Sequence, residues 1–202
     1  MSAPSDGTSS FQAMEPLILV AGTFDILHAG HFLLFHAAFH AAAQVEVWLS
    51  SDAMCSEKSR RCGQALQSFA QRSALVQAWL DAQTPASIAA FEGGTAPIPA
   101  APGCAAAYGA LAHPYTGRYS LHSLPDALGP AATEARYTAI VCSQETRPGC
   151  EAINSQRLAA GLAPLRLLTV PLLCKQDGHK LSSSDERARL LAQGSREGAP
   201  EG

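Results

Sequence analysis

The chain has 202 residues, of which 47% are hydrophobic and 15% charged, and its formal net charge is −3. This length suits one domain, or one domain with an insertion, and the hydrophobic content can build a core. The slightly acidic balance gives no general reason to expect DNA, RNA or a membrane surface as a partner, although a local basic site remains compatible with it. No apolar run approaches the roughly 20 residues needed to span a bilayer.

The first residues, MSAPSDGTSSFQAMEP, are polar and small, without an apolar stretch or an arginine. They do not resemble a secretory signal or a transit peptide, so we expect residues 1–15 to form a disordered tail and the protein to be cytoplasmic. The cysteines are scattered without a CxxC pair, which favours reduced thiols over disulfides or a zinc site. They are Cys55, Cys62, Cys104, Cys142, Cys150 and Cys174.

Apolar runs that alternate with helical patterns predict a series of strands and helices. A buried strand is expected at 16–22, followed by a nearly continuous apolar helix at 30–43. The next strand is expected at 44–51 and an amphipathic helix at 66–83. A weaker strand candidate follows at 86–92.

Residues 93–118 change character, because Gly, Pro and Ala dominate and no period is visible. We expect an inserted, mobile loop there. The regular pattern then resumes. The elements expected after the loop are strands at 119–124, 137–143 and 164–170, helices at 150–161 and 182–194, and a disordered tail at 195–202.

This alternation predicts an α/β fold with a Rossmann-like, doubly wound parallel sheet, in a single domain over 16–194 that contains the 93–118 insertion. In such sheets ligands bind beyond the carboxyl ends of the strands, near helix N-termini. The polar clusters of this sequence follow the expected strands, at 21–31, 50–58, 142–147 and 174–187.

The stretch GTFDILHAGH, residues 22–31, directly follows the first strand. Gly22 allows a sharp turn, and the free N–H groups near Gly30 favour an anion at the start of the helix. His28 and His31 are three residues apart, so their imidazoles can converge on that point and grip a phosphate as its charge develops. The alternative is a capped helix with incidental histidines.

A second polar cluster, KLSSSDERARLL, follows the last expected strand. On its own a serine triplet is a helix N-cap. Together with GTFDILHAGH, however, it resembles the paired signatures of the His-x-Gly-His nucleotidyltransferase superfamily, whose second signature is Ser-Ser-Ser/Thr-x-x-Arg. The matching residues are Ser182, Ser183, Ser184 and Arg187.

The segment between the two signatures resembles the phosphopantetheine adenylyltransferases of the eukaryotic and archaeal type. The resemblance covers residues 17–92 and 119–192 and is absent from the first 15 residues and from 93–118. Two departures are Ala21, where the family has a first Gly, and the loss of one Pro from Asp-Pro-x-Gly-Pro. The matching motifs are Asp126–Pro130, Ser143–Thr146, Gly149, Ile153–Arg157 and Gly161–Leu165.

The resemblance implies transfer of an adenylyl group from ATP to 4′-phosphopantetheine, giving dephospho-coenzyme A and pyrophosphate, without a covalent enzyme intermediate. It also implies Mg²⁺ bound with ATP and bridging its phosphates, without dedicated metal ligands from the protein. Dephospho-coenzyme A or coenzyme A is expected as product or inhibitor, and the protein as a monomer without nucleic acid or membrane partners. In animal members of this family a dephospho-coenzyme A kinase domain often follows. Its Gly-x-x-x-x-Gly-Lys-Ser/Thr motif does not occur in this sequence, so only adenylyl transfer is expected.

The resemblance assigns the site residues in three groups. The catalytic residues are His28, His31 and Lys58. The residues expected to bind ATP are Gly22, Thr23, Phe24, Gly30, His31, Glu145, Arg157, Ser182, Ser183, Ser184 and Arg187. Those expected to bind 4′-phosphopantetheine are Thr23, Lys58 and Arg72.

Several of these assignments have alternatives. Arg60 or Arg61 can fill the role of Lys58, because the register of this basic stretch is uncertain, and all three can instead form a solvated turn. Arg72 can reach the site or make an ion pair on the helix surface. We expect Asp25 to hold the turn by hydrogen bonds. His36 and His40 are expected to be structural.

Two other functions compete with this interpretation. One is another transferase of the same superfamily, either a cytidylyltransferase acting on phosphocholine or phosphoethanolamine or a nicotinamide mononucleotide adenylyltransferase. The other is a non-catalytic regulatory homologue that keeps the fold and has lost the chemistry.

Overall fold

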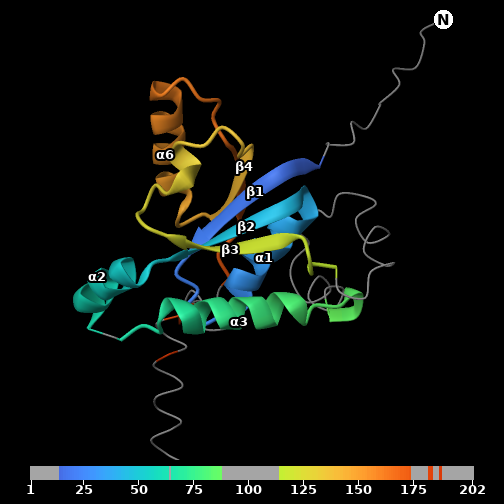
Figure 1. The fold of residues 1–202 in the computed structure, drawn as a ribbon, viewed down its shortest axis with the longest axis vertical. Helices are drawn as coiled ribbons and strands as arrows, with labels where there is room; N and C mark the ends of the chain where they lie inside the picture. Colours follow the sequence, from blue (N-terminus) through green and yellow to red (C-terminus); the bar gives the residue numbers. More distant parts are fainter. Residues whose placement is uncertain (1–13, 64, 88–113, 174–181, 184–186, 188–202) are drawn as a thin grey trace, which may run out of the picture.

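Five parallel strands form one sheet in the order β3-β2-β1-β4-β5 (Figure 1). The computed structural model describes residues 14–63, 65–87, 114–173, 182, 183 and 187. The chain begins in the central strand, moves outward to β3 and returns past β1 to β4, which places a topological switch point beside β1. The strands are β1 (Glu15–Gly22), β2 (Ala42–Ser50), β3 (Tyr119–Leu124), β4 (Ala139–Ser143) and β5 (Arg166–Val170).

Helices cover both faces of this sheet (Figure 1). On one face α1 packs on β1, β2, β4 and β5, and α3 packs on β2 and β3; on the other, α6 and the 3₁₀ turn η1 lie over β4 and β5. The doubly wound, Rossmann-like sheet that the sequence predicts is therefore confirmed. The helices are α1 (Ala29–Ala41), α2 (Asp52–Cys62), α3 (Phe69–Asp81), η1 (Pro130–Ala132) and α6 (Arg147–Ala159).

The core consists of two layers, one on each side of the central strand. Val20 of β1 packs with Phe35 and Phe39 of α1, whereas Leu19, which points to the opposite face, packs with Ile140 of β4 and Ile153 of α6. Burial on both faces explains why β1 is a continuous apolar run rather than an alternating one. Among the described residues, no helix is long and apolar enough to cross a membrane.

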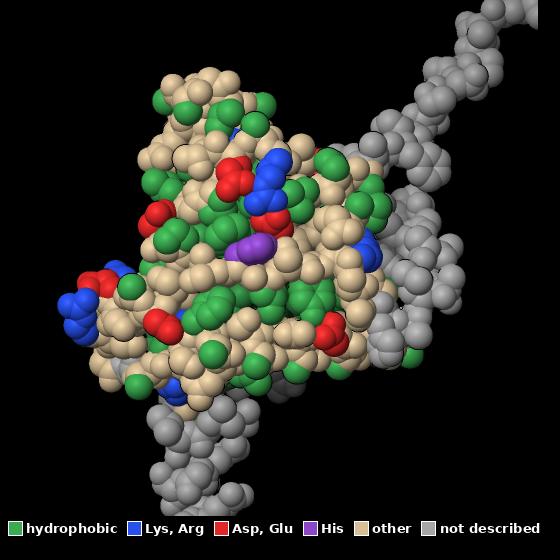
Figure 2. Space-filling view, viewed as in Figure 1, with side chains coloured by type: hydrophobic (Ala, Val, Ile, Leu, Met, Phe, Trp, Pro, Cys, Tyr) green, Lys and Arg blue, Asp and Glu red, His purple; other side chains and the backbone are tan. Residues whose placement is uncertain are grey.

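The part of the second face that lies over β2 and β3 is polar, and Figure 2 shows charged and histidine side chains gathered there. The Glu46 carboxylate accepts hydrogen bonds from Arg136, Tyr137 and the indole of Trp48, and the Trp48 ring stacks on His122 at 4.7 Å. Burial raises the pKa of Glu46, but these hydrogen bonds outweigh it and hold the pKa below its ordinary value. Because these side chains are polar, this area of the sheet can face water without a covering helix.

Several segments differ from the expected elements. Helix α3 begins at Phe69, three residues after the expected start at 66. Residues 85–87 are helical rather than the start of a strand at 86–92, because Thr84 and Ser87 cap each other's backbone and so begin a helical turn. Helix α2 occupies a stretch for which the sequence pattern predicted no element. Helix α6 begins at Arg147, three residues before the expected start at 150.

Only the end of the expected loop, 114–118, lies within the described residues, and that end is well packed. Tyr115 is fully buried and stacks on Phe39 at 4.0 Å. Arg118 donates hydrogen bonds to the carbonyl oxygens of Phe39, Ala42 and Pro114. Glu15, expected to end the N-terminal tail, is instead the first residue of β1 and pairs with Arg166 at 2.9 Å. Residues 1–13 of that tail, the tail expected at 195–202, most of the 93–118 insertion and most of the helix expected at 182–194 lie outside the described residues.

Candidate active site

The turn between β1 and α1 is shaped by close packing of Phe24 on Gly22. Phe24 has a φ of 50° and is 1% exposed. A Cβ atom added to Gly22 would lie 2.8 Å from Cζ of the Phe24 ring, so only glycine fits there. The left-handed conformation of a bulky residue is energetically costly and is commonly retained where function requires it.

His28 and His31 lie together over the N-terminus of α1, as their spacing predicted. His28 is the N-cap, and its Nδ1 atom accepts a hydrogen bond of 3.2 Å from the backbone N–H of Gly30. The two imidazole rings stack at 3.9 Å. A Cβ atom on Gly30 would lie 3.1 Å from the His28 ring, so the glycine gives that ring room to fold over the helix start.

The environment of His31 keeps its imidazole neutral near pH 7. Burial is the largest cause, followed by Coulombic interactions with His28 and Lys58, and together they lower the pKa of His31 to about 3 despite an opposing backbone hydrogen bond at Ile26. Its Nδ1 atom is buried and has no hydrogen-bond partner among the described residues. A neutral imidazole at a helix N-terminus can donate a hydrogen bond to an anion without first carrying a charge.

Lys58 comes to the same place from the next strand–helix junction. Helix α2 starts at its Ser51 N-cap, directly after β2, and the Lys58 ammonium donates to the Thr23 hydroxyl at 3.3 Å. Arg60, in contrast, is exposed and pairs with Glu57 on the same helix. Of the basic residues that the sequence left open, Lys58 is the one with a described contact to the β1–α1 turn.

The second signature reaches the first in space. The Ser183 hydroxyl donates to the Ile26 carbonyl at 3.0 Å, and the Arg187 guanidinium pairs with the buried carboxylate of Asp25. Asp25 also accepts a hydrogen bond of 2.8 Å from the backbone N–H of Gln67. The expectation that Asp25 holds the turn by hydrogen bonds is confirmed. Ser182 directly precedes Ser183 in the sequence and is described by the structure. Ser184 lies outside the described residues.

Arg72 lies beneath the site rather than on a helix surface. Its guanidinium is fully buried and donates to the backbone carbonyls of Thr23, Ser50 and Gln67 at 2.8–2.9 Å. The alternative of a helix-surface ion pair is therefore wrong. In this arrangement its donors are occupied by the protein itself, so the structure gives Arg72 a supporting position instead of a direct contact with 4′-phosphopantetheine.

Arg157 is not brought together with the other site residues. It is 1% exposed and donates to the carbonyl oxygens of Ala131, Glu134, Tyr137 and Ala163. Three of these carbonyls belong to the segment that leads into β4, at the amino end of the strand, whereas the site lies at the carboxyl ends. This placement disagrees with the expectation that Arg157 binds ATP, because its donors hold the backbone at the opposite edge.

Glu145 lies at the carboxyl edge of the sheet, in the exposed turn between β4 and α6. The turn is fixed by Thr146, whose hydroxyl accepts a hydrogen bond of 3.0 Å from the N–H of Ser143. Glu145 is thus on the same edge as the two histidines. Its contact with a nucleotide remains a prediction.

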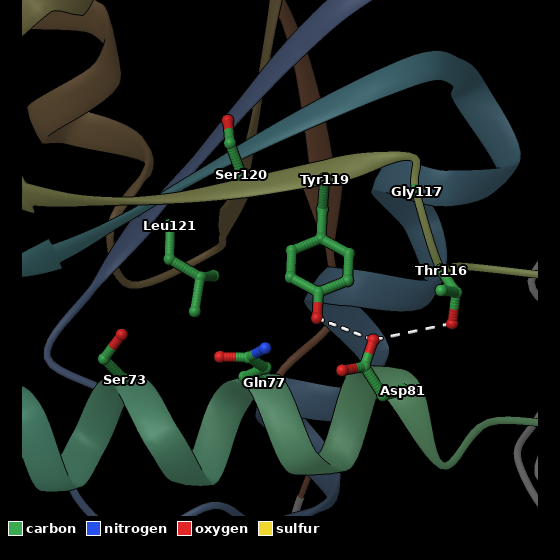
Figure 3. Close-up of a pocket in the computed structure, with 8 residues that line it drawn as sticks. All are labelled: Ser73, Gln77, Asp81, Thr116, Gly117, Tyr119, Ser120 and Leu121. Carbon is green, nitrogen blue, oxygen red and sulfur yellow. Dashed lines mark hydrogen bonds between the residues drawn. The ribbon is translucent and has the colours of Figure 1, made fainter.

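A groove of about 440 Å³ lies between α3 and β3 (Figure 3), and none of the predicted site residues lines it. Asp81 lies on its floor, where its carboxylate accepts a hydrogen bond of 2.7 Å from the Tyr119 hydroxyl. Burial, followed by the Asp81 carboxylate, raises the pKa of Tyr119. The groove is therefore separate from the cluster at the β1–α1 turn.

The cluster combines neutral donors, an ammonium group and a helix N-terminus, and these groups suit phosphate oxygens. Among the described residues the carboxylate in contact with it is that of Asp25, which is already bonded to Gln67 and Arg187. The described part of the chain contains no group of three or more His, Cys, Asp or Glu side chains placed to hold a metal ion. These groups come from distant parts of the sequence, and their chemistry suits an anion.

Comparison with known proteins agrees with this chemistry. Residues 19–111 match the family model described as cytidylyltransferase-like. The phosphopantetheine adenylyltransferase of Pyrococcus horikoshii is 28% identical over 174 residues, covering 86% of this chain and 89% of the relative. The protein of the same name from Thermococcus gammatolerans is 29% identical, over 86% of this chain and 89% of its own.

A solved structure gives the same result for the fold. A crystal structure of a protein of unknown function from Archaeoglobus fulgidus matches with a TM-score of 0.54 and 17% identity, over 82% of this chain and 98% of that one. The resemblance to the phosphopantetheine adenylyltransferases, which the motifs indicated, is confirmed over most of the chain. These comparisons support an enzyme of the nucleotidyltransferase type.

Proposed function

We propose that this chain, a relative of the archaeal phosphopantetheine adenylyltransferases, transfers an adenylyl group from ATP to 4′-phosphopantetheine, yielding dephospho-coenzyme A and pyrophosphate. The observation that carries the proposal is the contact of Ser183 with the Ile26 carbonyl, beside the stacked His28 and His31. It joins two helix-start motifs at one anion site, as a nucleoside triphosphate with an attacking phosphate requires.

In this reaction an oxygen of the acceptor's phosphate attacks the α-phosphorus in line, and the bond to the pyrophosphate oxygen breaks. Negative charge is crowded at the α-phosphate in the transition state, and fixed donors stabilise it there. The N–H of His31 donates to the α-phosphate beside His28. Lys58 and Thr23 hold the attacking phosphate. The Ser182 hydroxyl, the backbone N–H of Ser183 and the Arg187 guanidinium bind the departing β- and γ-phosphates.

Magnesium would enter with the nucleotide and neutralise phosphate charge, held by phosphate oxygens and water. The imidazole, hydroxyl and ammonium groups of the site suit phosphates better than a hard cation, so no residue of the described site is assigned as a metal ligand. The protein's own contribution is to orient the two substrates and to supply fixed donors.

The test is to follow pyrophosphate release by the full chain with ATP, Mg²⁺ and 4′-phosphopantetheine. We expect turnover that depends on the acceptor, and dephospho-coenzyme A as the product identified by mass. A panel with CTP in place of ATP, and with phosphocholine, phosphoethanolamine or nicotinamide mononucleotide as acceptor, separates the related transferases. Turnover with CTP but not ATP would contradict the proposal, and a folded protein inert with every pair would indicate a regulatory homologue.

A further inference from the structure

The Arg72 guanidinium lies directly behind the turn that carries Thr23. It donates to three carbonyl oxygens that end three different segments: Thr23 after β1, Ser50 at the end of β2, and Gln67 just before α3. Arg72 is 0% exposed. The planar guanidinium of arginine has several fixed donors and can hold three such segments in one geometry. The ammonium group of lysine has a single nitrogen and cannot make the same set of contacts.

The positive charge of Arg72 is only partly matched. In the part of the chain that the structure describes, the carboxylate in contact is that of Asp52, at 3.3 Å, and the Asp52 side chain is 62% exposed. The remaining partners are neutral carbonyl groups. A buried cation that is compensated mainly by dipoles leaves positive potential at its surroundings, since little water screens it.

Thr23 lies between this buried cation and Lys58. Its carbonyl accepts from Arg72 at 2.9 Å, and its hydroxyl accepts from the Lys58 ammonium at 3.3 Å. Asp52, at the start of the helix that carries Lys58, is also bonded to Arg72 and accepts from the N–H of Phe69 at 2.6 Å. Arg72 therefore holds Thr23 through its backbone carbonyl, and it holds the start of the helix that carries Lys58 through the Asp52 carboxylate.

We propose that Arg72 is the positioning residue of the acceptor-phosphate site: it fixes Thr23 and Lys58 at their separation and adds a buried positive charge behind the bound anion. The inference rests on the proposed function, because it takes Thr23 and Lys58 as the groups that hold the attacking phosphate. Arg72 acts through these two residues and does not touch the substrate.

The chain contains a matched control for this role. Arg157 is 1% exposed and donates to four backbone carbonyls, but it holds the segment at the amino end of β4. Loss of either guanidinium leaves buried carbonyls without donors and lowers stability. Of these two arginines, Arg72 lies behind the anion site and Arg157 does not, so only the loss of Arg72 should change anion binding.

The experiment compares R72Q, R72K, R157Q and R157K in the full chain. Binding of 4′-phosphopantetheine and of unphosphorylated pantetheine is measured by calorimetry without ATP, and kcat and KM are measured separately. R72Q should weaken 4′-phosphopantetheine binding at least ~tenfold and leave pantetheine binding within about twofold, since the lost contribution is electrostatic. R72K, which keeps the charge but not the three-way contact, should bind better than R72Q and still have a lower kcat. R157Q and R157K should bind as the wild type does.

A second variant tests the charge in the opposite direction. D52N keeps an acceptor for the Phe69 N–H and removes the carboxylate next to Arg72, so it should bind the acceptor phosphate about twofold or more tightly. If R72Q does not fold, R72K and D52N together still decide the outcome. Equal losses of 4′-phosphopantetheine affinity in the Arg72 and Arg157 variants would overturn the inference. So would a lower affinity of D52N for 4′-phosphopantetheine together with an unchanged affinity of R72K.

Inorganic phosphate separates a failure of this inference from a failure of the proposed function. If the wild type does not bind 4′-phosphopantetheine, the proposed function is wrong. Arg72 is then still tested with inorganic phosphate, which matches the acceptor's phosphate group, as the probe, and R72Q must bind it less tightly than R157Q. Equal binding of inorganic phosphate by these two variants refutes the role of Arg72 at the Thr23–Lys58 pair.

Discussion

The hydroxyl of Ser183 donates a hydrogen bond of 3.0 Å to the carbonyl of Ile26, although the two residues lie 157 positions apart in the sequence. The neighbouring residue, Asp25, pairs with Arg187 from the same distant segment. Two consecutive residues of the β1–α1 turn thus hold the second signature. The site is assembled by the fold, and its two halves are coupled through a buried carboxylate.

This coupling predicts a measurable interaction energy between Asp25 and Arg187. In a double-mutant cycle of D25A, R187A and the double variant, urea unfolding should give a coupling of about 1–3 kcal/mol, since breaking a buried ion pair strands the remaining charge. Each single variant should lose at least ~2 kcal/mol of unfolding free energy. D25A should lose more, because Asp25 also accepts from Gln67.

Arg147 and Glu151 provide the control for that cycle. They form an ion pair at 2.8 Å on α6, but their side chains are 51% and 54% exposed. The same cycle there should give a coupling below about 0.5 kcal/mol, because water screens the pair. Equal coupling energies in the two cycles would show that Asp25 and Arg187 are not held as a buried pair in solution.

His31 is expected to contribute to turnover more than to folding. H31A should lower kcat at least ~100-fold, consistent with loss of one preorganised transition-state donor. Because His31 is held neutral, an amide can replace part of its role, and H31N should recover activity relative to H31A. Turnover is compared with H122A, since His122 lies on the sheet face away from the site. Near-wild-type turnover of H31A would remove His31 from the mechanism.

The lowered pKa of His31 also predicts how stability depends on pH. The folded protein keeps this imidazole neutral down to a pKa of about 3, whereas in the unfolded chain it takes up a proton near 6.5. The unfolded state therefore binds more protons between these values, and stability contributed by neutral His31 is lost as pH falls below about 6.5. The slope is at most about 1.4 kcal/mol per pH unit.

Urea unfolding of the wild type and H31N between pH 5 and 7.5 measures this contribution. H31N has no titrating group at position 31, so its stability should fall less steeply with acidification than that of the wild type. The difference in slope between the two curves should disappear above pH 7, where His31 is neutral in both states. Parallel curves over the whole range would mean that His31 titrates alike in the folded and unfolded chains.

The sheet could be predicted because its central strands are apolar on both faces. The run ending at Gly22 has to be buried, and it is followed at once by a helix whose Phe35 and Phe39 complete the core. Helix α2 was missed because its residues are mostly polar. Two local signals could have found it: the Ser51 N-cap, and Gly63, which ends the helix at a φ of 65°.

The site could be predicted only where its geometry is local. The stacking of His28 and His31 follows from their spacing on one helix, so the sequence indicates it directly. Arg72 and Arg157 have no such signal, because an arginine on an amphipathic helix looks the same whether it meets solvent or buried carbonyls. Their placement depends on which strand ends meet the helix, and that is a property of the assembled sheet.

Lys58 and Arg60 give the last prediction, since the sequence alone did not distinguish them. Lys58 donates to Thr23 at 3.3 Å, whereas Arg60 is exposed and paired with Glu57. K58Q should lower kcat/KM for 4′-phosphopantetheine by about 10²- to 10³-fold, as expected for removal of a charged donor from a phosphate. R60Q should stay within about twofold, because an exposed ion pair contributes little. Both side chains lie on the exposed surface of α2, so the two variants should unfold at similar urea concentrations. An R60Q defect as large as that of K58Q would mean that the basic stretch acts as a diffuse patch of charge, and that the Thr23 contact does not select the residue that holds the acceptor.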